Sequence, residues 1–176
     1  MVNQIVSRLV RVIKLDKTVF SEIEHDEAAN TEAAIVVIAA AFLAAVGTGI
    51  SSGSVVAFLV RLIIGPLVGW LLWSWVTMFV GTRFFGGEAD FWEMARTLGY
   101  ANAPSALGLF AFIPCAGLLV GLVAWVLSLI VGYFAVQEAL DLPTDKTILT
   151  IVIGWVIVFV VNLVVGLMFG TAAAVL

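Results

Sequence analysis

The run AAIVVIAAAFLAAVGTGI, residues 33–50, decides the fold because it contains no charged side chain. As an α-helix it would be about 27 Å long at 1.5 Å per residue, close to the thickness of the hydrocarbon core of a bilayer. Asn30 and Thr31 precede the run, and either side chain can cap a helix that begins there. The sequence therefore predicts a first membrane-spanning helix over residues 33–50.

The whole chain, like this run, is rich in apolar residues. Of its 176 residues, 63% are apolar and 11% are charged, and the mean hydropathy is +1.20. Soluble domains are roughly 45–50% apolar and 25% charged. A soluble fold of this length leaves nearly a third of its chain surface wet, and too few polar residues are present to cover it. The composition therefore predicts an integral membrane protein.

Four further apolar runs follow the first, and we predict that each also crosses the bilayer: residues 55–81, 98–113, 118–136 and 147–170. In the second run, Gly65 and Pro66 predict a kink, because proline removes a backbone donor. The predicted fold class is an all-α membrane protein, a five-transmembrane-helix bundle over residues 33–176.

The run at residues 98–113 is short and carries Asn102 and Pro104, so a re-entrant segment is the alternative to a crossing. A single helix from Leu98 to Ala139 would measure about 60 Å, twice the hydrocarbon thickness. A tight hairpin around Pro114, with a crossing on each side, therefore fits better.

Residues 1–32 form a separate N-terminal segment that we place in the cytoplasm. Apolar residues recur at helical spacing from Val2 to Ile13, and polar and basic residues fill the opposite face. We predict an amphipathic helix in the membrane interface, with three cations contacting lipid headgroups: Arg8, Arg11 and Lys14. The alternative is that its apolar face packs on the cytoplasmic end of the bundle. The polar stretch that follows, residues 16–32, predicts a short helix around Phe20.

Basic residues fall on one side of the predicted topology. Seven of the eight occupy the N-terminal segment and two loops: Arg8, Arg11, Lys14, Lys17, Arg83, Arg96 and Lys146. Cytoplasmic loops of membrane proteins carry an excess of Lys and Arg. We therefore expect a multi-pass cell-membrane protein with its N-terminus in the cytoplasm and its C-terminus outside.

Polar residues inside the predicted spans form a candidate intramembrane cluster of Arg61, Asn102 and Asn162. By helical rise, Arg61 and Asn162 each lie roughly 9 Å below the outer membrane surface. We hypothesise that Arg61 donates to Asn162 or to carbonyls freed by Pro66. Polar groups at this depth are costly and often mark a site. A substrate or lipid-headgroup site and ordinary snorkelling or packing are the two interpretations.

Glycines recur four residues apart in three places, a spacing that lets helices approach closely. Packing within the bundle is the first interpretation and dimerisation the second. The three pairs are Gly65 with Gly69, Gly117 with Gly121, and Gly166 with Gly170.

Several function classes are disfavoured by the sequence. It contains no Ser/His/Asp set, no His pair at metal-ligand spacing, no phosphate-binding loop and no intramembrane carboxylate relay, so we expect no enzyme activity, metal or cofactor. The lone histidine, His25, lies in an acidic stretch that we interpret as a solvated face. The net charge of −4 argues against nucleic acid as a partner.

The segment RTLGYANAP, residues 96–104, carries a short motif of Gly99, Tyr100 and Pro104. With the polar stretch KLDKTVFSEIEHD, residues 14–26, and the order of the spans, it resembles the Yip family of Ypt/Rab-interacting membrane proteins, in particular its prokaryotic members. The resemblance implies a five-helix bundle with a cytoplasmic N-terminus, in a prokaryotic inner membrane. Eukaryotic relatives are partners of small GTPases and of one another. The sequence lacks their long N-terminal domain and their Asp-Leu-Tyr-Gly-Pro motif, so Rab binding is not implied.

These observations lead to two hypotheses of function. The first is a non-enzymatic scaffold or adaptor that binds other membrane proteins or itself and contacts membrane lipids. The alternative is a small transporter or lipid-handling protein with a polar site near Arg61, Asn102 and Asn162. A carrier requires a polar cavity that reaches the middle of the membrane, whereas a scaffold predicts a closed, apolar interior.

Overall fold

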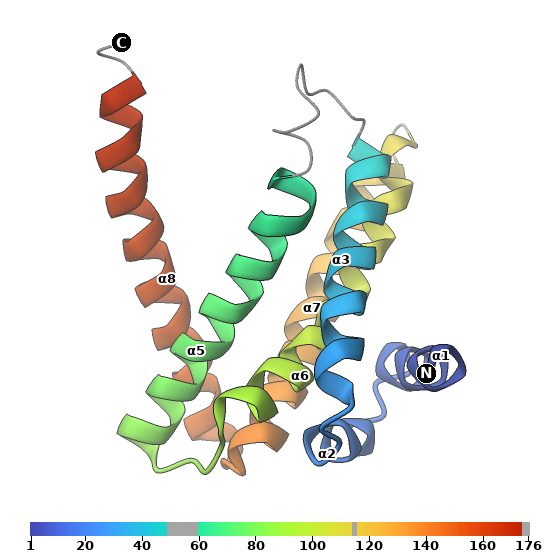
Figure 1. Cartoon of the computed structure of the whole chain (residues 1–176), viewed down its shortest axis with the longest axis vertical. Helices are drawn as coiled ribbons and strands as arrows, with labels where there is room; N and C mark the ends of the chain where they lie inside the picture. The colour runs from blue at the N-terminus through green and yellow to red at the C-terminus, as the bar shows by residue number, and fades with distance from the viewer. Residues whose placement is uncertain (49–59, 114–115, 174–176) are drawn as a thin grey trace.

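The computed structural model describes residues 1–48, 60–113 and 116–173, and these residues form helices without any strand (Figure 1). The predicted all-α class is therefore confirmed. In chain order the helices are α1 (Val2–Ile13), α2 (Thr18–Glu24), α3 (Ala29–Thr48), the π-helix η1 (Val60–Ile64), α5 (Gly65–Phe85), α6 (Phe91–Ala101), the 3-10 helix η2 (Ala103–Phe112), α7 (Ala116–Leu140) and α8 (Thr144–Ala173).

Four of these helices have the length and hydropathy that a membrane crossing needs, over Ala29–Val46, Leu62–Phe85, Gly117–Leu140 and Thr144–Val164. They correspond to the first, second, fourth and fifth predicted spans. Large apolar side chains such as Leu118 are exposed on their outer faces, as expected of helices that meet lipid instead of water. The chain is therefore a multi-pass membrane protein. Figure 1 shows α8 leaning away from the other helices toward its C-terminal end.

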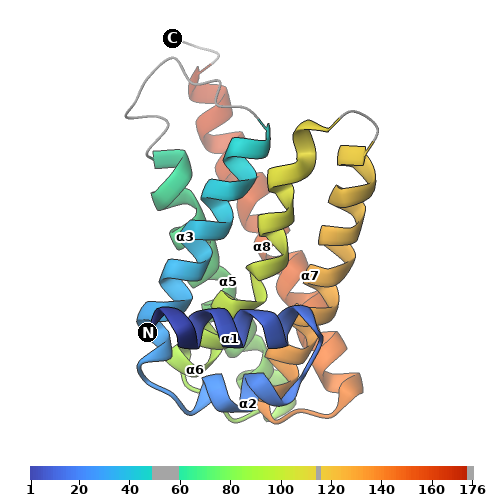
Figure 2. The same ribbon diagram turned by 90° about the vertical axis from the view of Figure 1, so that its right-hand side faces the viewer.

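The third predicted span is built from two elements in place of one α-helix. The α-helix α6 ends at Ala101 with Asn102 as its C-cap residue, and Pro104 lies in the first turn of η2. Gly99 packs against Ala33, and nine residues later Gly108 packs against Ala44, so this segment and α3 run side by side in the same direction (Figure 2). A 3-10 helix rises about 2.0 Å per residue against 1.5 Å in an α-helix. The ten residues of η2 therefore cover about 20 Å instead of about 15 Å.

The kink predicted at Gly65 and Pro66 coincides with the π-helix η1, which ends at Ile64. Because Pro66 has no backbone N–H, the preceding turn lacks a donor and the helix widens there. At its other end α5 stops at Gly86, whose φ of 75° is left-handed and suits glycine. The next amide, that of Gly87, donates to the Gly81 carbonyl at 3.0 Å, which closes the helix end.

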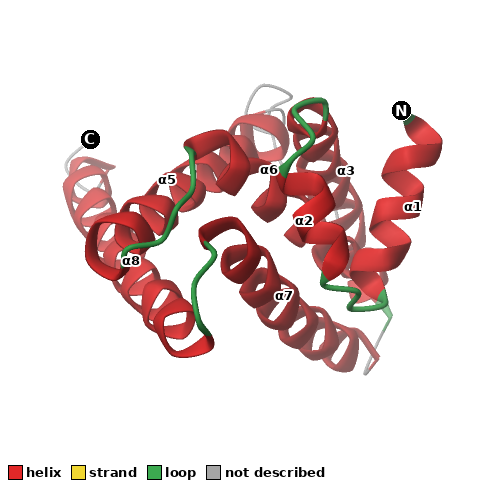
Figure 3. Cartoon of the chain, turned by 90° about the horizontal axis from the view of Figure 1, so that it is seen from below, coloured by secondary structure: helices red, strands yellow, loops and turns green. Residues whose placement is uncertain are grey.

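The loops that carry most charged residues gather at one end of the molecule, which we call the α2 end. The Lys146 ammonium donates to the Phe85 carbonyl at 3.1 Å, and the Glu88 amide donates to the Leu140 carbonyl at 3.1 Å. The two loops of the bundle that follow α5 and α7 therefore touch there. Figure 3, viewed from this end, shows α1 and α2 on the opposite side of the molecule from α8.

The N-terminal helix α1 lies across the faces of α3 and η2 (Figure 2). It buries Ile5, Arg8 and Val12 against the bundle and leaves Val6 and Val10 exposed. The predicted short helix around Phe20 is present as α2, and its apolar side is buried beneath the bundle. One flank of α1 thus packs on the bundle, as the alternative interpretation expects, and a second apolar strip stays open.

Candidate functional site

Four helices meet at a group of ion pairs that we call the Arg8 cluster: Arg8, Glu22, Asp26, Glu32 and Tyr100. Arg8 of α1 is 3% exposed, and each nitrogen of its guanidinium donates to a different carboxylate. Nε donates to Glu22 at 3.0 Å, Nη2 to Asp26 at 2.6 Å and Nη1 to Glu32 at 2.8 Å. The planar guanidinium, with its fixed fork of donors, is suited to join several carboxylates in this way.

Glu32 is the buried centre of the Arg8 cluster. The Tyr100 hydroxyl of α6 donates to the Glu32 carboxylate at 2.6 Å, and both side chains are buried. Glu32 also lies in the first turn of α3, where the helix dipole favours a negative charge. Arg8, Tyr100 and the helix terminus therefore together stabilise a carboxylate that would be costly to bury alone.

Two arginines, Arg8 and Arg11, bind the carboxylates at the edge of the cluster. The Arg8 guanidinium lowers the pKa of the Asp26 carboxyl by hydrogen bonding to its charged form. Arg11 binds the other oxygen of Glu22 at 2.5 Å and also binds Asp16 at 2.8 Å. These ion pairs of Arg11 therefore join the last turn of α1 to the loop that follows it and to α2.

A second buried arginine, Arg96 of α6, holds the C-terminal end of α2. Its Nε donates to the carbonyl of Glu24, the last residue of α2, at 2.6 Å, and its Nη2 donates to the same carbonyl. Basic side chains satisfy terminal carbonyls of helices in this manner. On the other side of α6, the Trp70 indole N–H of α5 donates to the Ala95 carbonyl at 2.8 Å. Helix α6 is thus fastened to both α2 and α5.

The residues of the family-like motif hold the segment formed by α6 and η2 against α3. A Cβ atom on Gly99 would lie 2.5 Å from the Cβ of Ala33, so the close approach of α6 to α3 requires glycine at this position. Tyr100 reaches Glu32 across the same contact. Pro104 is buried in the first turn of η2. The motif therefore has a structural explanation in the packing of two helices.

The three cations expected to meet lipid have different surroundings in the structure. Arg8 is buried among carboxylates and Arg11 is paired with Asp16 and Glu22. Lys14 is exposed, and within residues 1–48, 60–113 and 116–173 it forms no ion pair with an acidic residue. Of the three, Lys14 is therefore the cation available to a headgroup.

The two asparagines expected at membrane depth each bind their own segment of the chain. The Asn102 amide donates to the Leu98 carbonyl at 2.9 Å and the Asn162 amide to the Val158 carbonyl at 2.8 Å. Each amide thus binds the preceding turn of the chain, and no hydrogen bond joins these two described asparagines. The side chain of Arg61 lies outside the described part of the chain.

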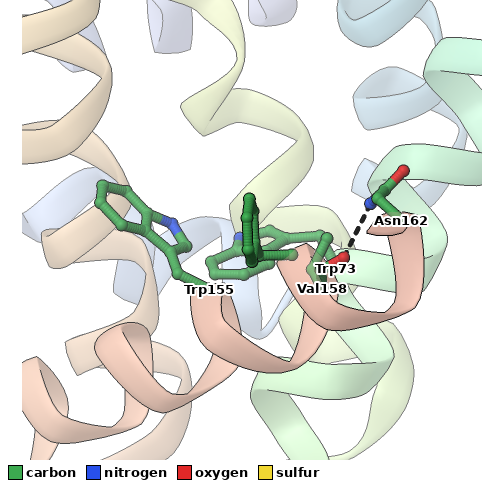
Figure 4. Close-up of a pocket in the computed structure, with 5 residues that line it drawn as sticks. Trp73, Trp155, Val158 and Asn162 are labelled. Carbon is green, nitrogen blue, oxygen red and sulfur yellow. Dashed lines mark hydrogen bonds between the residues drawn. The ribbon is translucent and has the colours of Figure 1, made fainter. Parts of the chain in front are cut away.

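Asn162 lines an open groove of about 630 Å³ between α5 and α8 (Figure 4). The other lining residues are apolar or aromatic: Trp73, Trp155, Val158 and Phe159. The groove therefore presents a single amide in an otherwise apolar surface.

The structure describes the surroundings of four of the six glycines at this spacing. A Cβ atom on Gly69 or Gly121 would meet nothing within 4 Å, and Gly65 is exposed. Gly117, at the start of α7, packs closely on the backbone carbonyl of Ala111 in η2. The remaining two predicted glycines lie in α8, where their surroundings fall outside the description: Gly166 and Gly170.

Sequence reasoning does not identify Glu32 as a site residue, because Glu32 directly precedes the uncharged run and belongs to the polar stretch of residues 16–32. The available signal was the position of Arg8, three residues after Ile5 and four before Val12. This spacing places the arginine on the buried face of α1. A buried arginine requires acceptors for its donors, either carboxylates or backbone carbonyls, but the sequence does not say which groups these are.

Comparison with curated proteins and with solved structures gives no match. The Yip1 domain, in contrast, matches residues 12–166. The match includes the four bundle helices, the Gly99, Tyr100 and Pro104 motif, and Glu32. Arg8 lies just before it. The chain therefore belongs to the Yip1 domain family of membrane proteins.

Proposed function

We propose that this protein is a non-enzymatic membrane scaffold or adaptor that holds other membrane proteins, or further copies of itself, through its α2 end. The observation that carries the proposal is the Arg8 cluster. Its donors and acceptors bind one another and fasten α1 and α2 to the bundle, so these polar groups build a surface instead of lining a pathway. A rigid, docked surface is what an adaptor needs, because ordering it on binding would cost affinity.

The charge of the α2 end favours a partner with basic residues. All twelve acidic residues and seven of the eight basic residues lie in residues 1–32, 83–96 and 138–146, which we assign to this end. Glu27, Glu88 and Asp141 are exposed, and we expect them to face the solution. Complementary charge accelerates association and selects among partners more than it raises affinity.

We place the α2 end in the cytoplasm and propose five crossings. The excess of Lys and Arg at this end supports the orientation. The parallel course of η2 beside α3, and the extra length of a 3-10 helix, support a third crossing by α6 and η2. With five crossings the C-terminus lies outside.

Reporter fusions test this topology. A fluorescent protein that matures only in the cytoplasm and a phosphatase active only outside it would be fused after residue 142 and at the C-terminus. Five crossings predict the fluorescent signal at residue 142 and phosphatase activity at the C-terminus. If η2 does not cross, both assignments reverse.

A charge-reversal experiment tests the partner surface. The double variant E27K/E88K changes two exposed acids at the α2 end, and K17E/R83E is the matched control that makes the same end more acidic. Affinity-tagged protein would be extracted in native nanodiscs and its co-purifying proteins quantified. We expect E27K/E88K to lose partners that K17E/R83E retains. Equal recovery by both variants would contradict an acidic recognition surface.

The local hydrogen bonds of the two asparagines also support a scaffold over a carrier. Asn102 and Asn162 bind carbonyls close to them in the chain, and the groove beside Asn162 is otherwise apolar. A transport pathway requires polar groups that converge on one cavity.

A further inference from the structure

An apolar groove lies in the corner between α1, α3 and η2. Its volume is about 180 Å³. Side chains of α1, including Ile13, form one wall. On the other side, small side chains leave space for the groove: Ala39 and Ala40 from α3, and Ala103 and Ala106 from η2.

A second apolar groove of about 100 Å³ lies on the other side of η2, against α7. Both grooves are lined by Ile13, Ala103 and Ala106, so they meet beneath the C-terminal end of α1. Figure 2 shows α1 crossing this face of the bundle, with α3, η2 and α7 continuing beyond it.

The first groove extends from the level of α1 into the membrane-spanning part of the bundle. Arg8 of α1 contacts Glu32 near the start of α3, whereas the groove reaches Leu43. These eleven residues of α3 correspond to about 16 Å along the helix. The groove thus extends from α1 to the depth of the acyl chains.

Two exposed lysines follow Ile13, a residue that lines the groove. Lys14 directly follows Ile13, and Lys17 lies three residues further along the chain. Both lysines are exposed, and neither pairs with an acid within the described ranges. Arg8 and Arg11, in contrast, are neutralised by their carboxylates. The C-terminal end of α1 therefore brings an apolar groove and two ammonium groups without acidic partners close together.

We propose that this corner is a binding site for one anionic phospholipid, with an acyl chain in the groove and its phosphate at Lys14. The inference rests on the proposed cytoplasmic position of α1. The acyl chain gains little from moving between lipid and protein, since both surroundings are apolar. Selectivity comes from charge, and one lysine near a membrane surface gives roughly a fivefold preference for anionic lipid.

Native mass spectrometry tests the proposal on the full chain. The purified protein would be released from bilayers of equal phosphatidylglycerol and phosphatidylcholine, and the lipids that stay bound would be counted. We expect one retained phosphatidylglycerol. Lys14→Gln should keep a bound lipid but lower the ratio of phosphatidylglycerol to phosphatidylcholine about fivefold. Arg83→Gln, which removes an exposed cation elsewhere at the α2 end, should leave the ratio unchanged.

Filling the groove tests its role separately from the charge. Ala106→Phe should abolish retention of the lipid. If this variant does not fold, Ala39→Leu on the opposite wall should give the same loss. Gly121→Leu adds bulk at a position where a Cβ atom meets nothing within 4 Å, and it should retain lipid like the wild type.

Retention by both groove variants, or an unchanged lipid ratio in Lys14→Gln, would overturn the proposal. A dimer that is lost on filling the groove would also overturn it, because a second copy would then be the occupant. These readouts use the purified chain alone, so the lipid site can fail while partner capture at the α2 end succeeds.

Discussion

The Tyr100 hydroxyl and the Arg8 guanidinium donate to the same oxygen of Glu32, at 2.6 and 2.8 Å. One carboxylate oxygen therefore joins α1, α3 and α6. All three side chains are buried, so each depends on the other two to satisfy its hydrogen bonds.

Replacing Tyr100 by Phe should destabilise the protein. The substitution removes a hydrogen bond to a buried charged group, which contributes about 1.5–3 kcal/mol. Unfolding by SDS titration in mixed micelles would measure the change in free energy. Tyr133→Phe is the matched control, because the Tyr133 hydroxyl binds Thr144 at an exposed site. Equal effects of the two substitutions would show that the Tyr100 bond has no special importance.

Replacing Arg8 by Met should release α1 from the bundle. The change leaves Glu32 buried without its cation, and breaking a buried pair in this way costs about 3–5 kcal/mol. Hydrogen exchange would report faster exchange of the α1 amides. Arg11→Met should change α1 exchange little, because its ion pairs with Asp16 and Glu22 are partly open to solvent. Adding Glu32→Gln to Arg8→Met should restore part of the protection, and failure to do so would contradict the role of the buried charge.

Adding a methyl group at Gly99 should force α6 away from α3. A Cβ atom there would lie 2.5 Å from that of Ala33, and overpacking of this kind costs about 1–3 kcal/mol. Thermal unfolding in detergent would detect the loss for Gly99→Ala. Gly121→Ala should behave like the wild type, and Ala33→Gly should rescue Gly99→Ala. If Gly99→Ala unfolds at the wild-type temperature, the two helices can move apart at little cost and the prediction is wrong.

The α2 end should become less stable as the pH rises toward neutrality. Burial raises the pKa of the Glu24 carboxyl to about 7, and the negative charge of Asp141 adds to the effect. Glu93 and Glu138 raise it further, whereas His25 lowers it. Because the folded state binds the proton more tightly than the unfolded state, stability is lost as the pH increases from about 4.5 to 7. Melting temperatures between pH 5 and 8 should fall, and Glu24→Gln should flatten the profile. An unchanged profile in the variant would assign the pH dependence to another group.

Hydropathy was sufficient to identify four crossings, because a bilayer demands a long, uncharged run whatever the helices contact. The third segment needed more information. Asn102 and Pro104 indicated an interruption, but hydropathy cannot distinguish an α-helix from the 3-10 helix that follows Pro104. That choice depends on the packing of η2 against α3, which includes the contact of Gly108 with Ala44.

The Arg8 cluster was beyond sequence reasoning because its members are distant in the chain. Arg8 and Glu32 are 24 positions apart, and Glu32 and Tyr100 are 68 apart. Helical spacing relates residues only within a few turns, so it placed Arg8 on a face without naming its partners. The motif containing Tyr100 marked the right helix, but the burial of Glu32 emerges only when α3 and α6 are packed together.

The central claim is that partner proteins are held at the α2 end, where the Arg8 cluster docks α1 and α2 on the bundle. Quantitative co-purification from native nanodiscs, with wild type, Arg8→Met and Arg11→Met compared at equal expression, tests it most directly. We expect wild type and Arg11→Met to recover the same partners, and Arg8→Met, whose α1 is released, to lose most of them. Recovery of those partners by Arg8→Met at the wild-type level, or recovery of none by any of the three, would contradict the claim.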